Sequence, residues 1–407
     1  ARSRLPGRRH RKANTDFPVR TTVYPRSIHH LLAFRVNTER AGTWQAAVHA
    51  RSLDTDVTEA PFTRTGVHDD SFDFSSGWQR RVVISDALTS RVGIDLFGRR
   101  GVDARQTRLD LDPNSTAPTT RTTSLAGAHE TEVGAFATLG GAGPRSRFEI
   151  GARAKSFSQG NRAASGRHDR AASGHASLVT SMAPQVLLAF HVGTGLRFPS
   201  LTERFFSGTT GRGQIAGNPA LDAERSFDTQ IELRKVSTRW LLTSSVFRTR
   251  IDDFIERVEV APDDLTFINL TSGTLTGLDL HAVWHASTAW RVGFGGNVID
   301  GETAAGANLS DVTPASLFAS LHHRGGRWST AARWTVRARK ADPGSGEKSI
   351  SGAHLLSASL TFQATPDWRV AMTATNLLDD AFFPAADRKA SLAPGRSVGL
   401  SLTWADR

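Results

Sequence analysis

Apolar and polar residues alternate along most of this chain. In the last alternating run, every second residue is apolar and those between are small or polar: Val398, Leu400, Leu402 and Trp404 against Gly399, Ser401 and Thr403. The same period of two recurs in residues 44–49, 227–234, 278–285, 356–363 and 368–373. Because successive side chains of a strand point to opposite faces, the pattern predicts strands with one apolar and one polar face. A helical period is nowhere sustained, so we expect an all-β fold.

The lengths of the alternating runs and of the connections narrow this fold class. Runs of about ten residues fit a tilted strand that crosses a bilayer, whereas strands of soluble sandwiches have about 5 or 6 residues. The connections fall into short ones and long ones: 287–289, 325–327 and 365–367 against 198–224, 300–312 and 340–350. Short turns at one end and long loops at the other are typical of a transmembrane, antiparallel, up-and-down β-barrel. We expect roughly 16 to 18 strands.

Several tryptophans lie near the ends of the alternating runs: Trp44, Trp240, Trp290, Trp328, Trp368 and Trp404. Membrane barrels place girdles of aromatic residues at the two membrane interfaces, which favours a barrel. Tryptophan is also enriched in the strands of soluble proteins. The positions therefore support the membrane interpretation without excluding a soluble one.

Composition excludes several other classes. The chain has 407 residues, no cysteine, 39% hydrophobic residues and a mean hydropathy of −0.30. Without cysteine it cannot be a disulfide scaffold or a cysteine-ligated metal protein. No stretch approaches the roughly 18 apolar residues of a membrane-spanning helix. A membrane barrel has a modest mean hydropathy because only alternate residues face lipid, so composition leaves a barrel and a soluble β protein open.

The charge is strongly basic, at +11, and nearly all of the basic residues are arginines. Arginines spread along the whole chain do not define a binding patch, but the first twelve residues are locally dense in basic side chains: Arg2, Arg4, Arg8, Arg9, Arg11 and Lys12. No nucleic-acid recognition motif follows this cluster, so we predict no nucleic-acid partner. We interpret residues 1–22 as a ragged basic segment and residues 23–407 as the barrel.

Four short motifs carry a resemblance to a known family. Residues 197–203 (RFPSLTE) and 217–221 (GNPAL) follow one another in the middle of the chain, and residues 376–380 (NLLDD) and 394–396 (PGR) precede the last run. In this order, from about residue 190 onward, they resemble the C-terminal barrel of TonB-dependent outer-membrane receptors. A complete receptor of this family holds a plug inside a barrel of about 22 strands. We find neither the plug nor the first four to six strands in this sequence, and therefore expect an incomplete barrel.

The resemblance implies a function and a location. It predicts a receptor for TonB-dependent uptake of a scarce nutrient, in the cell outer membrane of a Gram-negative-type bacterium. The implied partners are outer-membrane lipid and lipopolysaccharide, a small ligand, and the TonB complex through the missing plug. We expect a monomer that is not competent for transport without the plug.

The two central motifs predict where a ligand would bind. Pro199 and Pro219 cannot donate to a strand ladder, so they mark strand ends and the residues between them form a long loop at the mouth. We expect mainly structural roles for the motif residues Phe198, Pro199, Asn218, Pro219, Asn376, Pro394, Gly395 and Arg396. We predict ligand contact for the charged and aromatic residues near the opening: Arg197, Arg204, Phe205, Phe206 and Arg212.

The composition of this loop also indicates a ligand class. A haem receptor needs axial donors, normally His or Tyr, at its opening. Residues 200–217 contain no His, and the only tyrosine of the chain is Tyr24. Arginine and phenylalanine instead suit an anionic chelate with aromatic groups. We therefore favour an iron-siderophore, with cobalamin and oligosaccharides left open.

Enzymatic chemistry is not indicated. The sequence lacks GxSxG, HExxH and phosphate-binding glycine motifs in a strand-turn-helix setting. Adjacent histidines, as in His29-His30 and His322-His323, point to opposite faces of a strand, which is poor geometry for one shared metal. We predict no catalytic residue, no metal and no cofactor. The alternatives to a receptor are a passive porin-like channel and a soluble carbohydrate-active β protein.

Overall fold

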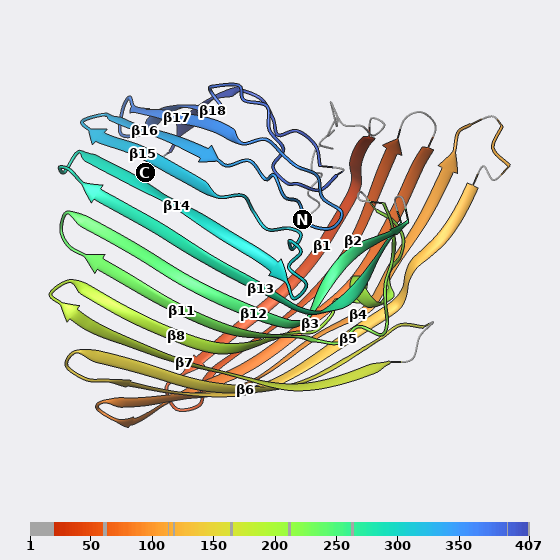
Figure 1. The fold of residues 1–407 in the computed structure, drawn as a ribbon, viewed down its shortest axis with the longest axis horizontal. Helices are drawn as coiled ribbons and strands as arrows, with labels where there is room; N and C mark the ends of the chain where they lie inside the picture. Colours follow the sequence, from red (N-terminus) through yellow and green to blue (C-terminus); the bar gives the residue numbers. More distant parts are fainter. Residues whose placement is uncertain are drawn as a thin grey trace. The chain divides into compact units, whose positions relative to one another are not determined.

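The computed structural model describes residues 20–59, 63–112, 114–116, 119–162, 166–210, 213–261, 264–388 and 390–405. These residues form one short helix, α1 (Leu201–Phe205), and 19 strands (Figure 1). The strands are β1 (Arg20–Thr38), β2 (Gly42–Glu59), β3 (Thr63–Ser85), β4 (Leu88–Asp110), β5 (Thr119–Ala142), β6 (Ser146–Gly160), β7 (Arg167–Ala183), β8 (Val186–Arg197), β9 (Ser207–Thr210), β10 (Gly213–Ala216), β11 (Glu224–Val236), β12 (Trp240–Ala261), β13 (Asp264–His285), β14 (Trp290–Thr303), β15 (Ser316–Gly325), β16 (Trp328–Arg337), β17 (Ala353–Gln363), β18 (Trp368–Thr375) and β19 (Ser397–Trp404).

The long strands pair antiparallel with their neighbours in the chain. This holds from β1 through β6 and again from β13 through β19. Without the four-residue strands β9 and β10, 17 strands remain in the described residues, within the predicted range. Short turns such as 39–41 and 326–327 alternate with long connections such as 304–315 and 338–352. The predicted antiparallel all-β class is therefore confirmed. The connection lengths alternate from β13 onward, whereas the connections 60–62 and 262–263 are short where the alternation would place long ones.

The chain divides into two compact units. Unit 1 comprises residues 1–177, 193–227 and 251–272, and unit 2 comprises residues 178–192, 228–250 and 273–407. Unit 1 contains β1 to β6, α1, β9 and β10, whereas unit 2 contains β14 to β19. The two central motifs belong to unit 1 and the two C-terminal motifs to unit 2.

The strands of unit 1 have two different faces. One row across six paired strands is almost wholly apolar: Val36, Trp44, Trp78, Ile94, Ala135 and Ala154. The adjacent row on the opposite face is polar or small: Arg35, Gln45, Gly77, Asp95, Gly134 and Lys155. Side chains on the first face are accessible, with Phe34 59% and Ile94 53% exposed. We call these the apolar face and the polar face of unit 1.

Unit 2 repeats this separation at the end of the chain. Leu402, Val370, Phe362 and Trp328 lie in one row across β19, β18, β17 and β16. Ser401, Ala371, Thr361 and Ser329 form the adjacent row on the opposite face. Leu400 is 78% exposed. The faces predicted for the last run are thus confirmed.

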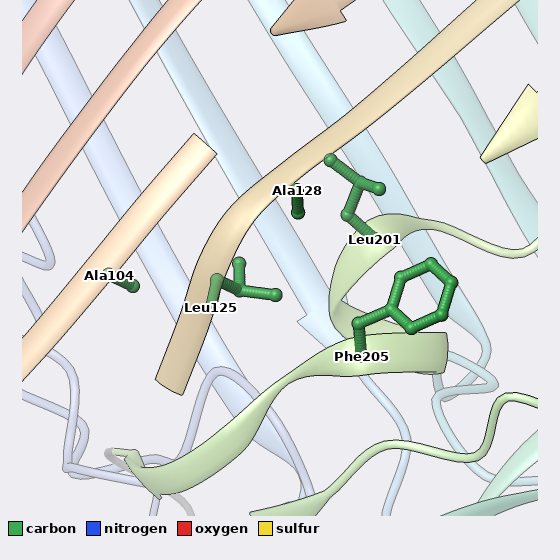
Figure 2. Close-up of a cluster of buried hydrophobic side chains, with 5 residues drawn as sticks. All are labelled: Ala104, Leu125, Ala128, Leu201 and Phe205. Atoms are coloured by element: carbon green, nitrogen blue, oxygen red, sulfur yellow. The ribbon is translucent and has the colours of Figure 1, made fainter. Parts of the chain in front are cut away.

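Buried apolar packing is concentrated in a small cluster around α1. Figure 2 shows Leu201 and Phe205 of α1 beside Leu125 and Ala128 of β5, with Ala104 of β4 completing the cluster. The side chain of Phe206 is half-buried against the same group. This cluster holds α1 against the strands of unit 1 and so positions the loop that contains it. No helix in the described part of the chain is long and apolar enough to cross a membrane.

Candidate functional site

The candidate site is the long loop of residues 198–223 between β8 and β11. Its helix α1 begins with a capping box, in which the Ser200 side chain accepts from the Glu203 amide and the Glu203 carboxylate accepts from the Ser200 amide. These reciprocal bonds satisfy amide groups that would otherwise lack partners at a helix start. The helix ends after five residues because Phe206 returns to an extended conformation. Two apolar residues of this short helix then pack into the cluster of Figure 2.

Arg204 is fully buried, and its guanidinium is bound by three protein groups. Its Nη1 donates to Gln159 Oε1 at 2.9 Å, and its Nη2 donates to Asp169 Oδ2 at 3.0 Å and to the carbonyl of Leu221 at 2.8 Å. Burial lowers the pKa of Arg204, while the contact with Asp169 opposes this shift. Arginine nevertheless stays charged in proteins. It therefore fastens α1 to β6, to β7 and to the second motif.

The side chain of Gln159, which binds Arg204, also binds β5 and the first motif. Gln159 is itself fully buried, and its Nε2 donates to Glu130 Oε2 at 3.1 Å and to the carbonyl of Pro199 at 2.8 Å. The ring of Phe198 stacks on Phe157, with centroids 4.4 Å apart and planes 4° apart. The first motif is thus held to the polar side of β5 and β6 by both hydrogen bonds and ring packing.

Arg197 lies at the end of β8 and is shared by two carboxylates. It donates from Nη2 to Glu224 Oε1 at 2.8 Å and from Nη1 to Glu203 Oε2 at 2.9 Å. Glu224 also accepts the amide of Ile255 at 2.8 Å. The Arg197 side chain remains 45% exposed. It links the end of β8 to the start of β11 and to the capping box of α1.

The second motif closes against the first. The amide of Asn218 donates to the carbonyl of Glu203 at 2.7 Å, and the Asn218 side chain donates to the carbonyl of Phe267 at 2.9 Å. A side chain at Gly217 would place its Cβ 2.8 Å from the backbone of Arg204. Only glycine permits this approach of the two motifs. Pro219 follows in the turn that returns the chain toward β11.

The short strands β9 and β10 extend the loop. They pair antiparallel with each other, and β10 pairs in parallel with the start of β13. Gln106 of β4 is buried and clamps β9, since its amide group donates to the carbonyl of Thr209 at 2.9 Å and accepts the Thr209 amide at 3.1 Å. Arg212, which lies between β9 and β10 in the sequence, is outside the described residues.

The C-terminal motifs form a separate hydrogen-bonded turn in unit 2. The Asn376 side chain accepts the Asp380 amide at 3.0 Å and donates to the Asp380 carbonyl at 3.0 Å and to the Pro394 carbonyl at 3.4 Å. Asp379 accepts the amide of Arg396 at 2.8 Å across Gly395. The Asp380 side chain also accepts the amide of His354 on β17 at 2.7 Å, which fastens the turn to that strand.

The predicted ligand-contacting residues therefore differ in exposure. Arg204 and Phe205 lie in the interior, Phe206 is half-buried, and Arg197 is partly exposed but paired. The sequence around Arg204 contains no local sign that this charged residue would be buried. Its partners Gln159 and Asp169 come from strands 45 and 35 positions earlier in the chain.

Sequence reasoning also missed a continuous polar row beside the loop. Paired positions across β2 to β6 bring together His49, Asp73, Arg99, Glu130 and Gln159. Arg99 donates to Asp73 at 2.8 Å and lies 3.9 Å from Glu130. Because Gln159 contacts both Glu130 and Arg204, the row continues directly into the loop. The alternating pattern predicts which residues of each strand are on the polar face. Which of them face one another across the strands depends on the pairing register, which the sequence does not show.

A second group of charges lies beside this row on the polar face of unit 1. Arg153 pairs with Asp95 and lies 3.9 Å from Glu132, which Lys155 also contacts at 2.8 Å. Such a wall of alternating charges is suited to water and polar solutes and unsuited to hydrocarbon. Within the described residues, no group of three or more histidines and carboxylates has the arrangement of a metal site.

The comparison with protein families identifies the class. Residues 3–377 match the family described as TonB dependent receptor-like, beta-barrel. The chain therefore belongs to the TonB-dependent receptor-like β-barrel family, which confirms the resemblance seen in its motifs. Members of this family are transporters and not enzymes, and they belong to Gram-negative outer membranes.

Solved structures agree on the fold. The copper transporter OprC matches with a TM-score of 0.78 at 17% identity, over 94% of this chain and 66% of that one. The ferric-catecholate import receptor Fiu from E. coli K12 matches with a TM-score of 0.68 at 11% identity, over 96% of this chain and 65% of that one. The ferric yersiniabactin uptake receptor FyuA from Yersinia pestis gives 0.69 at 14% identity, over 96% and 62%.

These three comparisons establish the fold, and the chain spans less than two thirds of the length of each of these proteins. No curated protein sequence matches the chain.

Proposed function

We propose that this chain is the barrel part of a receptor that takes up a scarce nutrient by TonB-dependent transport. Membership of the family is the observation that carries this proposal. The polar face of unit 1, with its ion pairs between Arg99, Asp73 and Glu130, supports it, because a transport path needs a hydrated wall. The proposed location is the outer membrane of a Gram-negative-type bacterium. The apolar faces would contact outer-membrane lipid and lipopolysaccharide.

The proposed ligand is an iron-siderophore. The absence of His from residues 200–217 argues against haem, which needs an axial donor. Two of the solved proteins of similar fold, Fiu and FyuA, are described as receptors for ferric chelates, and OprC as a copper transporter. A ferric chelate with aromatic groups fits the phenylalanine and arginine content of the long loop.

The residues of the loop that were proposed to contact the ligand differ in how exposed their side chains are, and this decides which of them we retain. Phe206 is half-buried and retains accessible ring surface, so we propose it as an aromatic contact. Arg212 remains a proposed cationic contact from the sequence. Arg197 shares its charge with Glu203 and Glu224, which weakens its attraction for an anion. We no longer propose direct contact for Arg204 and Phe205, because both are buried.

The partners proposed for the whole protein are the TonB complex and the chelate, with the protein acting as a monomer. The test is uptake of radiolabelled ferric siderophores by cells that express the protein and lack other receptors, with and without TonB. We expect TonB-dependent uptake that falls several-fold in Phe206→Ala. The exposed phenylalanine Phe294, on β14, provides the matched control Phe294→Ala, which should leave uptake unchanged.

Three other results would contradict the proposal. Growth on haem as sole iron source, with no growth on ferric siderophores, would exclude the proposed ligand. Entry of small solutes independent of TonB would indicate a passive porin-like channel. Recovery of the protein from the soluble fraction without detergent would favour a soluble β protein.

A further inference from the structure

The polar face of unit 2 carries a group of basic and aromatic side chains near the short-turn end of its strands. The group consists of His281 and His285 of β13, Arg291 of β14, Phe318 and His322 of β15, and Arg333 of β16. The pairing register places them on the same face as Ser329, and we call them the cationic patch. The patch belongs to a different unit from the long loop of residues 198–223. The function proposed above gives it no role.

One row of the patch sets three basic side chains next to one another. His285 pairs with Arg291, and Arg291 pairs with His322 on the following strand. Like charges directly opposite one another on a sheet are destabilising. Protonation of either histidine beside Arg291 is therefore unfavourable without a counter-ion, and an anion bound over this row relieves the repulsion.

The neighbouring rows bring a guanidinium group onto an aromatic ring. The guanidinium carbon of Arg333 lies 3.7 Å from the ring centroid of Phe318, and the ring centroid of His281 lies 5.9 Å from that of Phe318. His281 and Phe318 are two strands apart, and they meet because Gly295 lies between them in the register. A Cβ at Gly295 would lie 2.9 Å from the Phe318 ring. This part of the patch therefore combines flat ring surface with a cation.

The arginines of the patch lack the carboxylate partners that arginines have in unit 1. On the polar face of unit 1, Arg153 pairs with Asp95. Arg333 instead makes one long hydrogen bond, from Nε to Thr335 Oγ1 at 3.4 Å. Among the described residues, no ion pair within 4.0 Å involves Arg291 or Arg333, and both arginines are exposed. Their donors are therefore accessible to a ligand.

We propose that the cationic patch binds a small aromatic molecule that carries negative charge. Arg291 and Arg333 bind its anionic oxygens, and Phe318 and His281 present ring surface to its aromatic part. The register sets the two arginines two strands and two residues apart, which is about 12 Å between Cα atoms, so a ligand of that width contacts both. The inference goes beyond the proposed function, because it assigns a second site on unit 2 and uses no residue of the long loop.

Equilibrium binding to the whole chain, refolded in a nonionic detergent, tests the patch without any transport. The probe is pyrene tetrasulfonate, a fluorescent aromatic anion, followed by fluorescence anisotropy at constant ionic strength. We expect one probe bound per chain. Salicylate, an aromatic anion, should displace the probe at about tenfold lower concentration than acetate, which has no ring to stack on Phe318. Benzyl alcohol, which has a ring and no charge, should not displace it at the concentration at which salicylate does.

Substitutions locate the binding. Arg333→Ala and Arg291→Ala should each weaken probe binding by about tenfold, because each removes charged hydrogen bonds to the anion. Arg333→Lys keeps the charge but loses the planar fork, and should give intermediate affinity. Phe318→Leu keeps an apolar side chain but loses the ring, and should weaken binding several-fold.

Arg369→Ala is the matched control. Arg369 is an exposed arginine on the polar face of β18. Its partner on β17, Gln363, is six positions from Ser357, the partner of Arg333, which is about 20 Å along the strand. This variant removes the same charge from the same face and should bind the probe like the unmodified chain.

Unchanged affinity in both Arg333→Ala and Arg291→Ala would overturn the proposal, provided that the variants show the same heat-modifiable gel mobility and so the same fold. An equal loss in Arg369→Ala would overturn it as well, because the probe would then respond to the basic charge of the chain in general. Displacement by acetate as effective as that by salicylate would refute aromatic recognition. A chain that binds the probe but fails in TonB-dependent uptake would contradict only the proposed function, and the reverse result would contradict only this inference.

Discussion

The long loop of residues 198–223 and the last strand, β19, are stabilised in opposite ways. In the loop, Arg204 is fully buried and its guanidinium is shared by Gln159, Asp169 and the carbonyl of Leu221. In β19, every side chain is exposed, and the protein holds the strand by its antiparallel pairing with β18. Side-chain contacts within the protein therefore stabilise the loop, whereas the side chains of β19 make few stabilising contacts with the rest of the protein.

The difference shows which part of the molecule depends on its surroundings. Apolar side chains such as Leu400, at 78% exposed, are unfavourable in water and favourable in hydrocarbon. The polar contacts of the loop need no lipid, because their partners are groups of the protein itself. Arg204 Nε is the exception, since it is buried without a hydrogen-bond partner. We therefore expect substitutions in the loop to act in any solvent and substitutions in β19 to depend on lipid.

The largest effect is expected from Arg204→Ala. Removal of one partner from a buried ion pair typically costs about 3–5 kcal/mol, because the other charge stays buried. Here Asp169 and Gln159 would lose their donor, and α1 would separate from β6 and β7. Hydrogen exchange should show the amides of Arg204 and Phe206 opening far more often than in the unmodified protein.

Arg64→Ala is the control for this experiment. Its side chain is 53% exposed and that of its partner Asp56 is 31% exposed, so water screens the ion pair and its loss should cost much less. An unchanged exchange rate in Arg204→Ala would mean that α1 is held by its apolar cluster alone. That result would remove the contrast between the loop and β19.

A smaller effect, which requires lipid, is expected in β19. Leu400→Arg should cost about 2–4 kcal/mol of folding free energy near the bilayer midplane, because lipid offers the guanidinium no water. Ser401→Arg, on the opposite face, should cost much less. Reversible urea unfolding from phospholipid vesicles measures both. Equal losses would refute the assignment of faces in this strand.

Alternation was sufficient to predict β19 because the signal is local. The run 398–404 falls within Ser397–Trp404, and its rows of side chains are those expected. The expected strand length of about ten residues was too short for β3, β4 and β5, which have 23, 23 and 24 residues. These strands continue past the apolar face, where apolar residues such as Val102, Ala104 and Leu125 are scattered among polar ones and no longer occupy every second position.

The interior of the loop could be predicted less well, for two separate reasons. The helix α1 did have a local signal, since Ser200 and Glu203 have the spacing of a capping box. Five residues are too few to show a helical period, so the segment was interpreted as loop. The burial of Arg204 had no local signal, because it depends on Gln159 and Asp169 from distant strands. Long-range partners of this kind follow only from the register.

The smallest expected effect concerns this same capping box. Ser200→Ala removes the oxygen that accepts the Glu203 amide at 3.2 Å, and loss of such a cap typically costs about 1 kcal/mol. The cost should be limited, because Leu201 and Phe205 still anchor α1 in the cluster of Figure 2. Hydrogen exchange at the Glu203 amide should therefore accelerate roughly fivefold. Thr202→Ala is the control, since Thr202 is exposed within the helix and takes no part in the capping box, and alanine favours helix. Similar acceleration in both variants would show that α1 responds to any substitution, and that the capping box contributes nothing of its own to the order of the loop.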